Sequence, residues 1–98
     1  MRVIAKAPNK APIILEMKNT LEELQEAVGG YIETVSFASY ACIVCNEEGR
    51  LKDMPFNCKI CGLDFFGPVL IVGVNGDAFT DLYRPESTAR LLFGECCV

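Results

Sequence analysis

Short apolar runs separated by polar, turn-forming residues mark the beginning of the chain. The runs "RVIAKA" (2–7) and "PIILEM" (12–17) are rich in residues that favour β-strands, and "PNKAP" between them is rich in residues that favour turns. The simplest structure for two such runs joined by a short turn is an antiparallel pair of strands.

A helical pattern follows in "NTLEELQEAVGG". Thr20 suits the N-cap position, and Glu23 three residues later completes a capping box. Gly29 suits the left-handed residue that ends a helix. The apolar residues recur at helical spacing, so one stripe is expected to face inward, formed by Leu21, Leu24 and Val28. These features predict a short helix over about 20–28.

Strand patterns return after this helix. Polar and apolar residues alternate over 31–37, whereas 40–45 is apolar on both faces, as in the central strand of a sheet. "NEEG" (46–49) then predicts a hairpin turn in which Gly49 has a positive φ.

The rest of the chain holds one more strand pattern and one more helix pattern. Segment 52–67 is predicted to be irregular, because a proline and two glycines interrupt it, whereas "PVLIVGV" (68–74) is typical of a buried strand. Pro85 precedes a short C-terminal helix whose inward residues are Ala89, Leu92 and Phe93. The order ββαββ…βα predicts an α+β fold, a mostly antiparallel sheet with both helices packed on one face.

Composition narrows the class of protein. The 98 residues fit a single domain over 1–98, and 51% of them are hydrophobic, enough for a core without metal or disulfide bonds. Thirteen acidic against nine basic residues give a net charge of −4, which argues against nucleic-acid binding. The chain has no histidine, so the commonest general base and the His-paired nucleophiles are missing, and no enzyme is expected.

The expected location follows from the apolar runs and the cysteines. No apolar run approaches the roughly 18 residues of a membrane span, so no membrane contact is expected. Proline and lysine interrupt the first twelve residues before a signal-peptide core could form. A cytoplasmic protein with reduced cysteines is therefore predicted. Cys96 and Cys97 are adjacent, and a strained bridge between them is not expected.

A set of short motifs resembles a known family. "NTLEELQ", "VGGYIE", "CNEEG", the "P-x-N" of Pro55 and Asn57, and "LIVG" occur in this order within residues 2–82. Together they resemble the domain of unknown function 3846, a family of small proteins common in phages and bacterial mobile elements. The resemblance implies a phage or mobile-element setting and supplies no catalytic residues. Cys58 departs from the family pattern, which usually has a basic residue after the asparagine.

Two Cys-x-x-Cys pairs separated by twelve residues raise the question of a metal. Structural zinc takes four ligands at tetrahedral corners, and the candidates here are Cys42, Cys45, Cys58 and Cys61. Gly62 permits the tight turn that a zinc knuckle needs after the second pair. The first pair lies inside a strand pattern, where residues three apart point to opposite faces. Buried cysteines and no cofactor are therefore favoured over zinc.

Two further chemical roles are open to this part of the chain. Asn57 could cap a turn of helix with Cys58 at its N-terminus, which would lower the thiol pKa and permit thiol–disulfide exchange. Glu47 and Glu48 could form an acid–base pair, but the solvated tip of a hairpin is the favoured interpretation.

These observations favour a non-enzymatic accessory protein that binds a host protein or a small signalling nucleotide, as a phage or mobile element would use against host defence. It would act in the host-cell cytoplasm, and an exposed sheet edge could support a homodimer. The expected contact residues lie in 46–66, where loops can form a binding surface, and are Asn46, Glu47, Glu48, Phe56 and Asn57. The alternative is a zinc-stabilised four-cysteine interaction module that could associate with nucleic acid.

Overall fold

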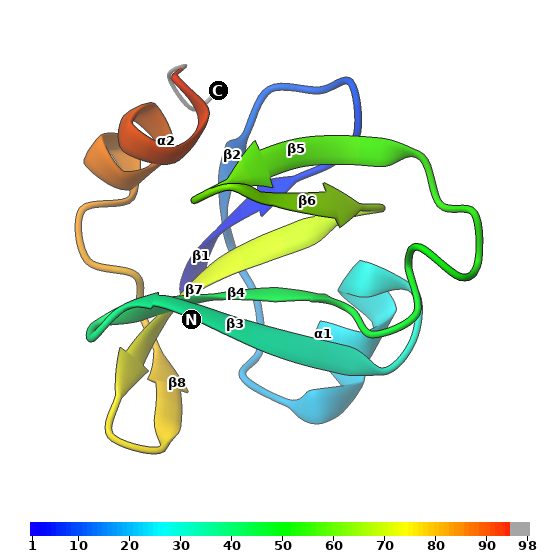
Figure 1. Ribbon diagram of the computed structural model, residues 1–98. Helices are drawn as coiled ribbons and strands as arrows, with labels where there is room; N and C mark the ends of the chain where they lie inside the picture. The colour runs from blue at the N-terminus through cyan, green and yellow to red at the C-terminus, as the bar shows by residue number, and fades with distance from the viewer. Residues whose placement is uncertain (95–98) are drawn as a thin grey trace.

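The computed structural model describes residues 1–94, and Figure 1 shows how its elements are arranged. In chain order they are β1 (Arg2–Lys6), β2 (Ile13–Glu16), α1 (Leu21–Val28), β3 (Ile32–Ala38), β4 (Ala41–Asn46), β5 (Phe56–Ile60), β6 (Leu63–Phe66), β7 (Val69–Asn75), β8 (Ala78–Thr80) and α2 (Pro85–Phe93). The predicted α+β fold with a mostly antiparallel sheet and a C-terminal helix is confirmed. No helix within residues 1–94 is both long and apolar enough to cross a membrane. Cys96 and Cys97 lie outside the described residues.

A sheet of six strands forms the centre of the molecule. Its strand order is β2-β1-β7-β4-β3, with β8 paired to β7 as well, and all the pairs are antiparallel. In the middle of the sheet, Ile71 of β7 pairs with Ile4 of β1 on one side and with Ile43 of β4 on the other. Every residue from Val69 to Gly73 is buried, as the continuous apolar run predicts for a central strand.

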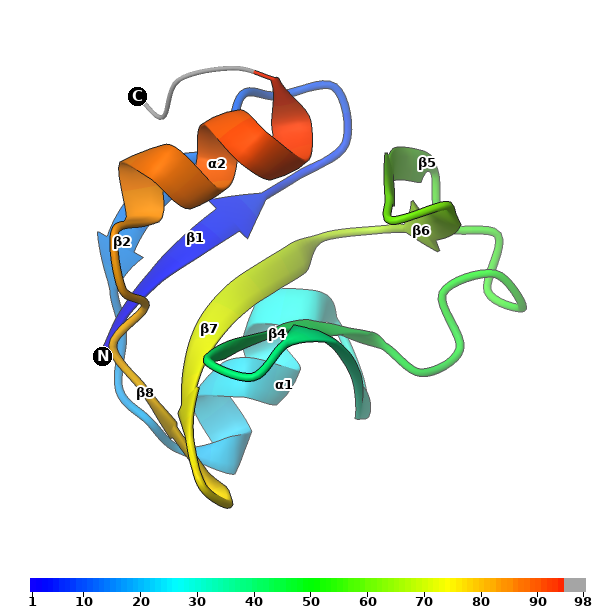
Figure 2. The same cartoon turned by 60° about the vertical axis from the view of Figure 1, so that its left-hand side comes forward.

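The two faces of this sheet are covered by different elements. On one face α1 packs against a cluster formed by Val3, Leu24, Val28, Cys42, Val44, Leu70 and Val72. On the other face, α2 and the β5–β6 hairpin contribute to a cluster formed by Ile4, Ala41, Ile43, Cys45, Ile60, Phe65, Val69, Ile71, Leu82 and Ala89. In Figure 2 the helices accordingly lie on opposite sides of β1 and β7. The prediction that both helices share one face was wrong, because central strands that are apolar on both sides need cover on both.

Helix α1 begins and ends as its sequence predicts. The Oγ1 of Thr20 accepts a hydrogen bond from the Glu23 amide at 3.2 Å, and Gly29 follows the helix with a left-handed φ of 81°. The buried residues of the helix are Leu24 and Val28. Leu21 is 54% exposed, so the predicted stripe was wrong at its first member. The helix therefore reaches the buried cluster through Leu24 and Val28, one turn apart, and not through its first residue.

Helix α2 also forms where the sequence predicts it. Pro85 lies in its first turn. Amide groups of the first turn have no hydrogen-bond acceptor within the helix, so a proline there removes no helical hydrogen bond. The inward residues are those predicted. Ala89 is buried in the cluster that contains Cys45, and Leu92 and Phe93 pack against that cluster. The residue before the helix, Arg84, has a left-handed backbone with a φ of 51°.

Two predictions within residues 46–67 were wrong. Segment 46–49 is no hairpin turn, because β4 pairs with β3 and β7 and not with the next strand. Gly49 does not have a positive φ; a Cβ there would lie 2.8 Å from the carbonyl oxygen of Phe66, so close packing requires the glycine. The segment expected to be irregular contains the β5–β6 hairpin, which turns at Cys61 and Gly62 with φ values of 50° and 82°.

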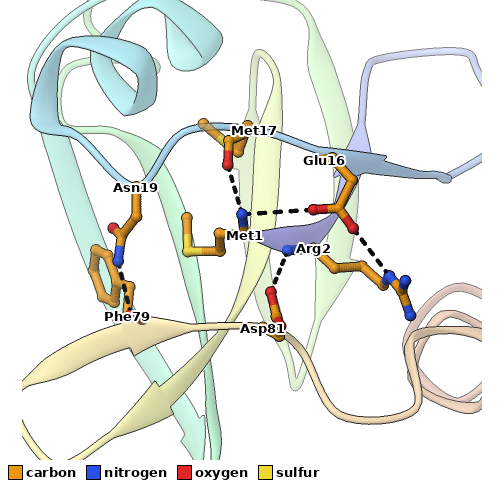
Figure 3. A network of polar contacts seen from close by, with 7 residues as sticks. All are labelled: Met1, Arg2, Glu16, Met17, Asn19, Phe79 and Asp81. Carbon is orange, nitrogen blue, oxygen red and sulfur yellow. Dashed lines mark hydrogen bonds and ion pairs between the residues drawn. The ribbon is translucent and has the colours of Figure 1, made fainter.

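Polar contacts tie the first strand to the segment that leads into α2 (Figure 3). The amide of Arg2 donates to Oδ1 of Asp81 at 2.7 Å, and the amide of Leu82 donates to the carbonyl oxygen of Arg2 at 2.8 Å. Asn19, just before α1, donates from Nδ2 to the carbonyl oxygen of Phe79 at 2.8 Å. These bonds fix the path of the chain between β8 and α2.

Candidate functional site

The first cysteine pair lies in β4, with its two side chains on opposite faces of the sheet. Cys42 belongs to the cluster beneath α1, and Cys45 belongs to the cluster shared with α2 and the hairpin. Both are buried, at 4% and 5% exposed. The expectation that this pair diverges is therefore confirmed, since residues three apart on a strand point in opposite directions.

The second cysteine pair lies in the β5–β6 hairpin. Cys58 is partly buried and packs against the same cluster as Cys45, whereas Cys61 is exposed at the turn. Cys42 lies across the sheet from them, so the four thiols do not converge. Within residues 1–94, no three side chains of cysteine, aspartate or glutamate come together in a group that could hold a metal ion.

Burial raises the pKa of three of these thiols. It raises the pKa of Cys42, and together with the nearby charge of Glu33 it raises the pKa of Cys45 to about 11. Burial also raises the pKa of Cys58, although the charge of Lys6 opposes the shift. Since the thiolate is the reactive form, these thiols are poorly suited to exchange at neutral pH. The predicted low pKa of Cys58 was wrong, because Asn57 lies in a strand and caps no helix.

The buried amide of Asn57 fastens the hairpin to the main sheet. It lies where the register of β5 and β6 shifts, and its Nδ2 donates to the carbonyl oxygens of Lys6 and Gly67, both at 2.7 Å. Its Oδ1 accepts a hydrogen bond from Nζ of Lys6 at 3.2 Å. The lysine is 7% exposed and also donates to the carbonyl oxygen of Ala7 at 3.0 Å. A buried polar cluster of this kind is stable only while each group keeps its partner.

Asn46 has a comparable role at the end of β4. Its Nδ2 donates to the carbonyl oxygen of Val28 at 3.1 Å, and its Oδ1 accepts from the amide of Glu48 at 2.7 Å. The side chain therefore joins the end of α1 to the beginning of the loop 47–55. Asn46 and Asn57 thus have roles within the fold, and contact with a partner stays a prediction for both.

The other predicted contact residues are exposed near the same loop. Together with two neighbours they form what we call the loop–hairpin surface, which consists of Glu47, Glu48, Arg50, Leu51 and Phe56. Leu51 is 83% exposed and Phe56 is 51% exposed. Figure 1 shows the loop and the hairpin on the side of the molecule away from β8.

Contacts with Phe66 of β6 hold two side chains of this surface, Arg50 and Phe56. The guanidinium of Arg50 lies 4.9 Å from the ring centroid of Phe66, and the ring of Phe56 meets the same ring edge-on at 5.7 Å. The side chain of Met54 lies so close to Gly67 that a Cβ there would collide with its sulfur. The surface is therefore presented by an anchored segment.

Arg50 and Leu51 were missed by the sequence analysis. The signal that could have found them is a lone leucine inside the charged run "EEGRLKD". The other residues of this run are charged or glycine, so the run forms no apolar face, and a leucine in such a loop is free to contact another molecule.

Comparisons with known proteins place the chain in one family. No curated protein and no solved structure matches it. The family model described as a domain of unknown function, DUF3846, matches residues 1–91. This range includes the whole sheet, α1, the loop–hairpin surface and most of α2. The chain therefore belongs to the DUF3846 family, as its motifs predict.

Proposed function

We propose that the protein is a non-enzymatic binding protein that contacts a protein partner through the loop–hairpin surface. The observation that carries the proposal is Leu51, whose side chain is 83% exposed next to the anchored pair of Arg50 and Phe66. Burying an exposed leucine in an interface contributes about 2 kcal/mol. Aromatic and arginine side chains around such an anchor are common where binding energy concentrates.

The chemistry of the described residues supports binding over catalysis. The chain has no histidine, and burial raises the pKa of Cys42, Cys45 and Cys58. Glu47 and Glu48 are exposed on a loop, the surroundings expected of solvated carboxylates. A surface with both charges and apolar groups suits recognition of another protein.

The partner follows from the setting that the family resemblance implies. Since the resemblance implies a phage or mobile element, we propose that the partner is a host protein and that the contact counters a host defence in the host cytoplasm. A small signalling nucleotide would need a cavity, and the cavities beside α1 and α2 are lined by no residue of 46–66 other than Cys61. A protein partner therefore suits the loop–hairpin surface better.

Capture from host lysates with matched variants tests the proposal. Leu51→Asp replaces the apolar contact with a charge, and Leu21→Asp makes the same change at a leucine of α1 that is 54% exposed. We expect a specific host protein to be retained by the wild type and by Leu21→Asp. After that protein is purified, Leu51→Asp should raise the Kd by roughly 30-fold or more.

Thermal melting of the two variants should show that both are folded. Equal retention of the host protein by both variants would contradict the proposal. A wild-type protein that retains no host protein in any of several host lysates would contradict it as well.

A further inference from the structure

A cavity lies beside the beginning of α2, away from the loop–hairpin surface. Its volume is about 510 Å³, and its lining is formed by Tyr40, Tyr83, Arg84, Ser87, Thr88 and Leu91. Tyr40 comes from the link between β3 and β4, and the other residues come from the approach to α2 and from the helix itself. In Figures 1 and 2 these two parts of the chain lie on the same side of the molecule. The volume is within the range of small-molecule sites.

The apolar part of the lining is largely exposed to solvent. Tyr40 is 49% exposed, Tyr83 is 59% exposed and Leu91 is 77% exposed. Within residues 1–94, the only ring–ring contact is between Phe56 and Phe66, so the two tyrosine rings do not stack on each other. Both rings can therefore pack against a planar ligand.

The charge of the lining has a single sign. Arg84 is the one charged side chain of the cavity, although the protein carries a net charge of −4. Its guanidinium lies 5.1 Å from the ring centroid of Tyr83, and the ion pairs within residues 1–94 do not include it. By contrast, a cavity of about 680 Å³ beside α1 has both lysine and glutamate side chains in its lining. Of these two cavities, the one that contains Arg84 is therefore complementary to an anion.

We propose that this cavity binds a small anion that carries a planar aromatic ring, the chemical class to which nucleoside monophosphates and cyclic nucleotides belong. The ring would pack against Tyr40 and Tyr83, and the anionic group would pair with Arg84. The hydroxyl of Ser87 can donate to the same anionic group. This site shares no residue with the loop–hairpin surface, so it goes beyond the proposed protein-binding function.

Titration of the whole chain with chosen probes tests the class of ligand. The probes are AMP, GMP, cyclic AMP, cyclic GMP and phenyl phosphate, with inorganic phosphate and adenosine as the two halves of a ligand. We expect at least one aromatic anion to bind with a Kd below about 1 mM, measured by calorimetry or NMR. Inorganic phosphate and adenosine should each bind at least about 10-fold more weakly, since each lacks one of the two contacts.

Variants then assign the binding to the cavity. Tyr40→Ala and Arg84→Gly should each weaken binding about 10-fold or more, whereas Tyr31→Ala, at a tyrosine that is 68% exposed elsewhere, should leave the Kd unchanged. Arg84→Gly should also raise the Tm, because glycine adopts the left-handed conformation of this residue without strain. Its loss of binding would then not result from unfolding.

Three results would overturn the proposal. The first is that no aromatic anion of the panel binds. The second is that inorganic phosphate binds as tightly as the best aromatic anion, which would exclude a role for the rings. The third is that Tyr31→Ala weakens binding as much as Tyr40→Ala, which would place the ligand elsewhere.

Discussion

The two Cys-x-x-Cys pairs have the same spacing and different structures. The first pair is part of an extended strand, and its side chains enter two different clusters on the two faces of the sheet. The second pair runs from β5 into the turn of a hairpin, with Cys58 partly buried on the strand and Cys61 exposed at the tip. Spacing fixes only the position of two thiols along the chain. The backbone between them decides whether they can share a ligand.

The residues inside the first pair and at the end of the second pair explain the difference. Ile43 and Val44 are β-branched and almost fully buried, at 1% and 0% exposed, so the chain runs straight through the core between the first two cysteines. In the second pair the chain reverses at Cys61 and Gly62, both with positive φ. Glycine adopts that conformation without steric cost, which makes it the stronger turn signal of the two.

Substitution by aspartate should separate the two pairs most clearly. Cys45→Asp places a carboxylate in an apolar cluster and is expected to lower the free energy of unfolding by about 3–5 kcal/mol. Cys61→Asp, at an exposed turn, should change it by less than about 0.5 kcal/mol. Urea unfolding followed by circular dichroism measures both.

If Cys45→Asp does not fold, the same comparison can be made with Cys45→Ser and Cys61→Ser. We expect their free energies of unfolding to differ by about 1–3 kcal/mol, less than for the aspartate variants. Equal effects at the two positions would mean that Cys45 is not in the core, contrary to the structure.

Alkaline pH should produce a smaller effect that depends on the first pair. The pKa of Cys45 is raised from 9.0 to about 11 in the folded protein. The folded state therefore holds this proton more tightly than the unfolded state, so the stabilisation is complete below about pH 9 and is lost as the pH rises toward 11. We expect the free energy of unfolding to fall by about 1–3 kcal/mol between pH 8 and 10.5.

Variants isolate the contribution of the thiols from that of other groups that titrate in this range. The fall in the free energy of unfolding at alkaline pH should be smaller in a Cys42→Ala/Cys45→Ala variant and unchanged in Cys61→Ala. A double variant with the same pH dependence as the wild type would show that neither buried thiol has a raised pKa.

Local signals predicted much of the fold. Helix α1 has a cap at Thr20 and an end signal at Gly29, and β7 is a continuous apolar run, so each carries its own evidence in sequence. The β5–β6 hairpin has a weak signal, because its strands have five and four residues, too few to show a clear period, and its turn glycine is equally typical of a break between elements. The runs of β4 and β7, apolar on both sides, indicate that both faces of the sheet are covered, but which element covers which face depends on tertiary packing.

The sites were less predictable than the fold, because their residues meet across long stretches of chain. Asn57 bonds to Lys6, which is 51 residues away in sequence, so nothing near the asparagine indicates that it is buried. The cavity beside α2 likewise brings Tyr40 to Tyr83 and Arg84. Of the residues in the two proposed sites, only exposed residues within 46–66 could be proposed as contacts from sequence, because their surroundings are polar and irregular.

The central claim is that Cys42 and Cys45 diverge, so that the two cysteine pairs cannot share one ion. Bound-metal analysis of protein purified without added zinc tests it most directly. We predict at most about 0.1 zinc per chain and a shift of less than about 1 °C in Tm on addition of a chelator. A stoichiometry near one zinc per chain, lost in both Cys42→Ser and Cys58→Ser, with a large fall in Tm on chelation, would contradict the claim and favour the zinc-stabilised module.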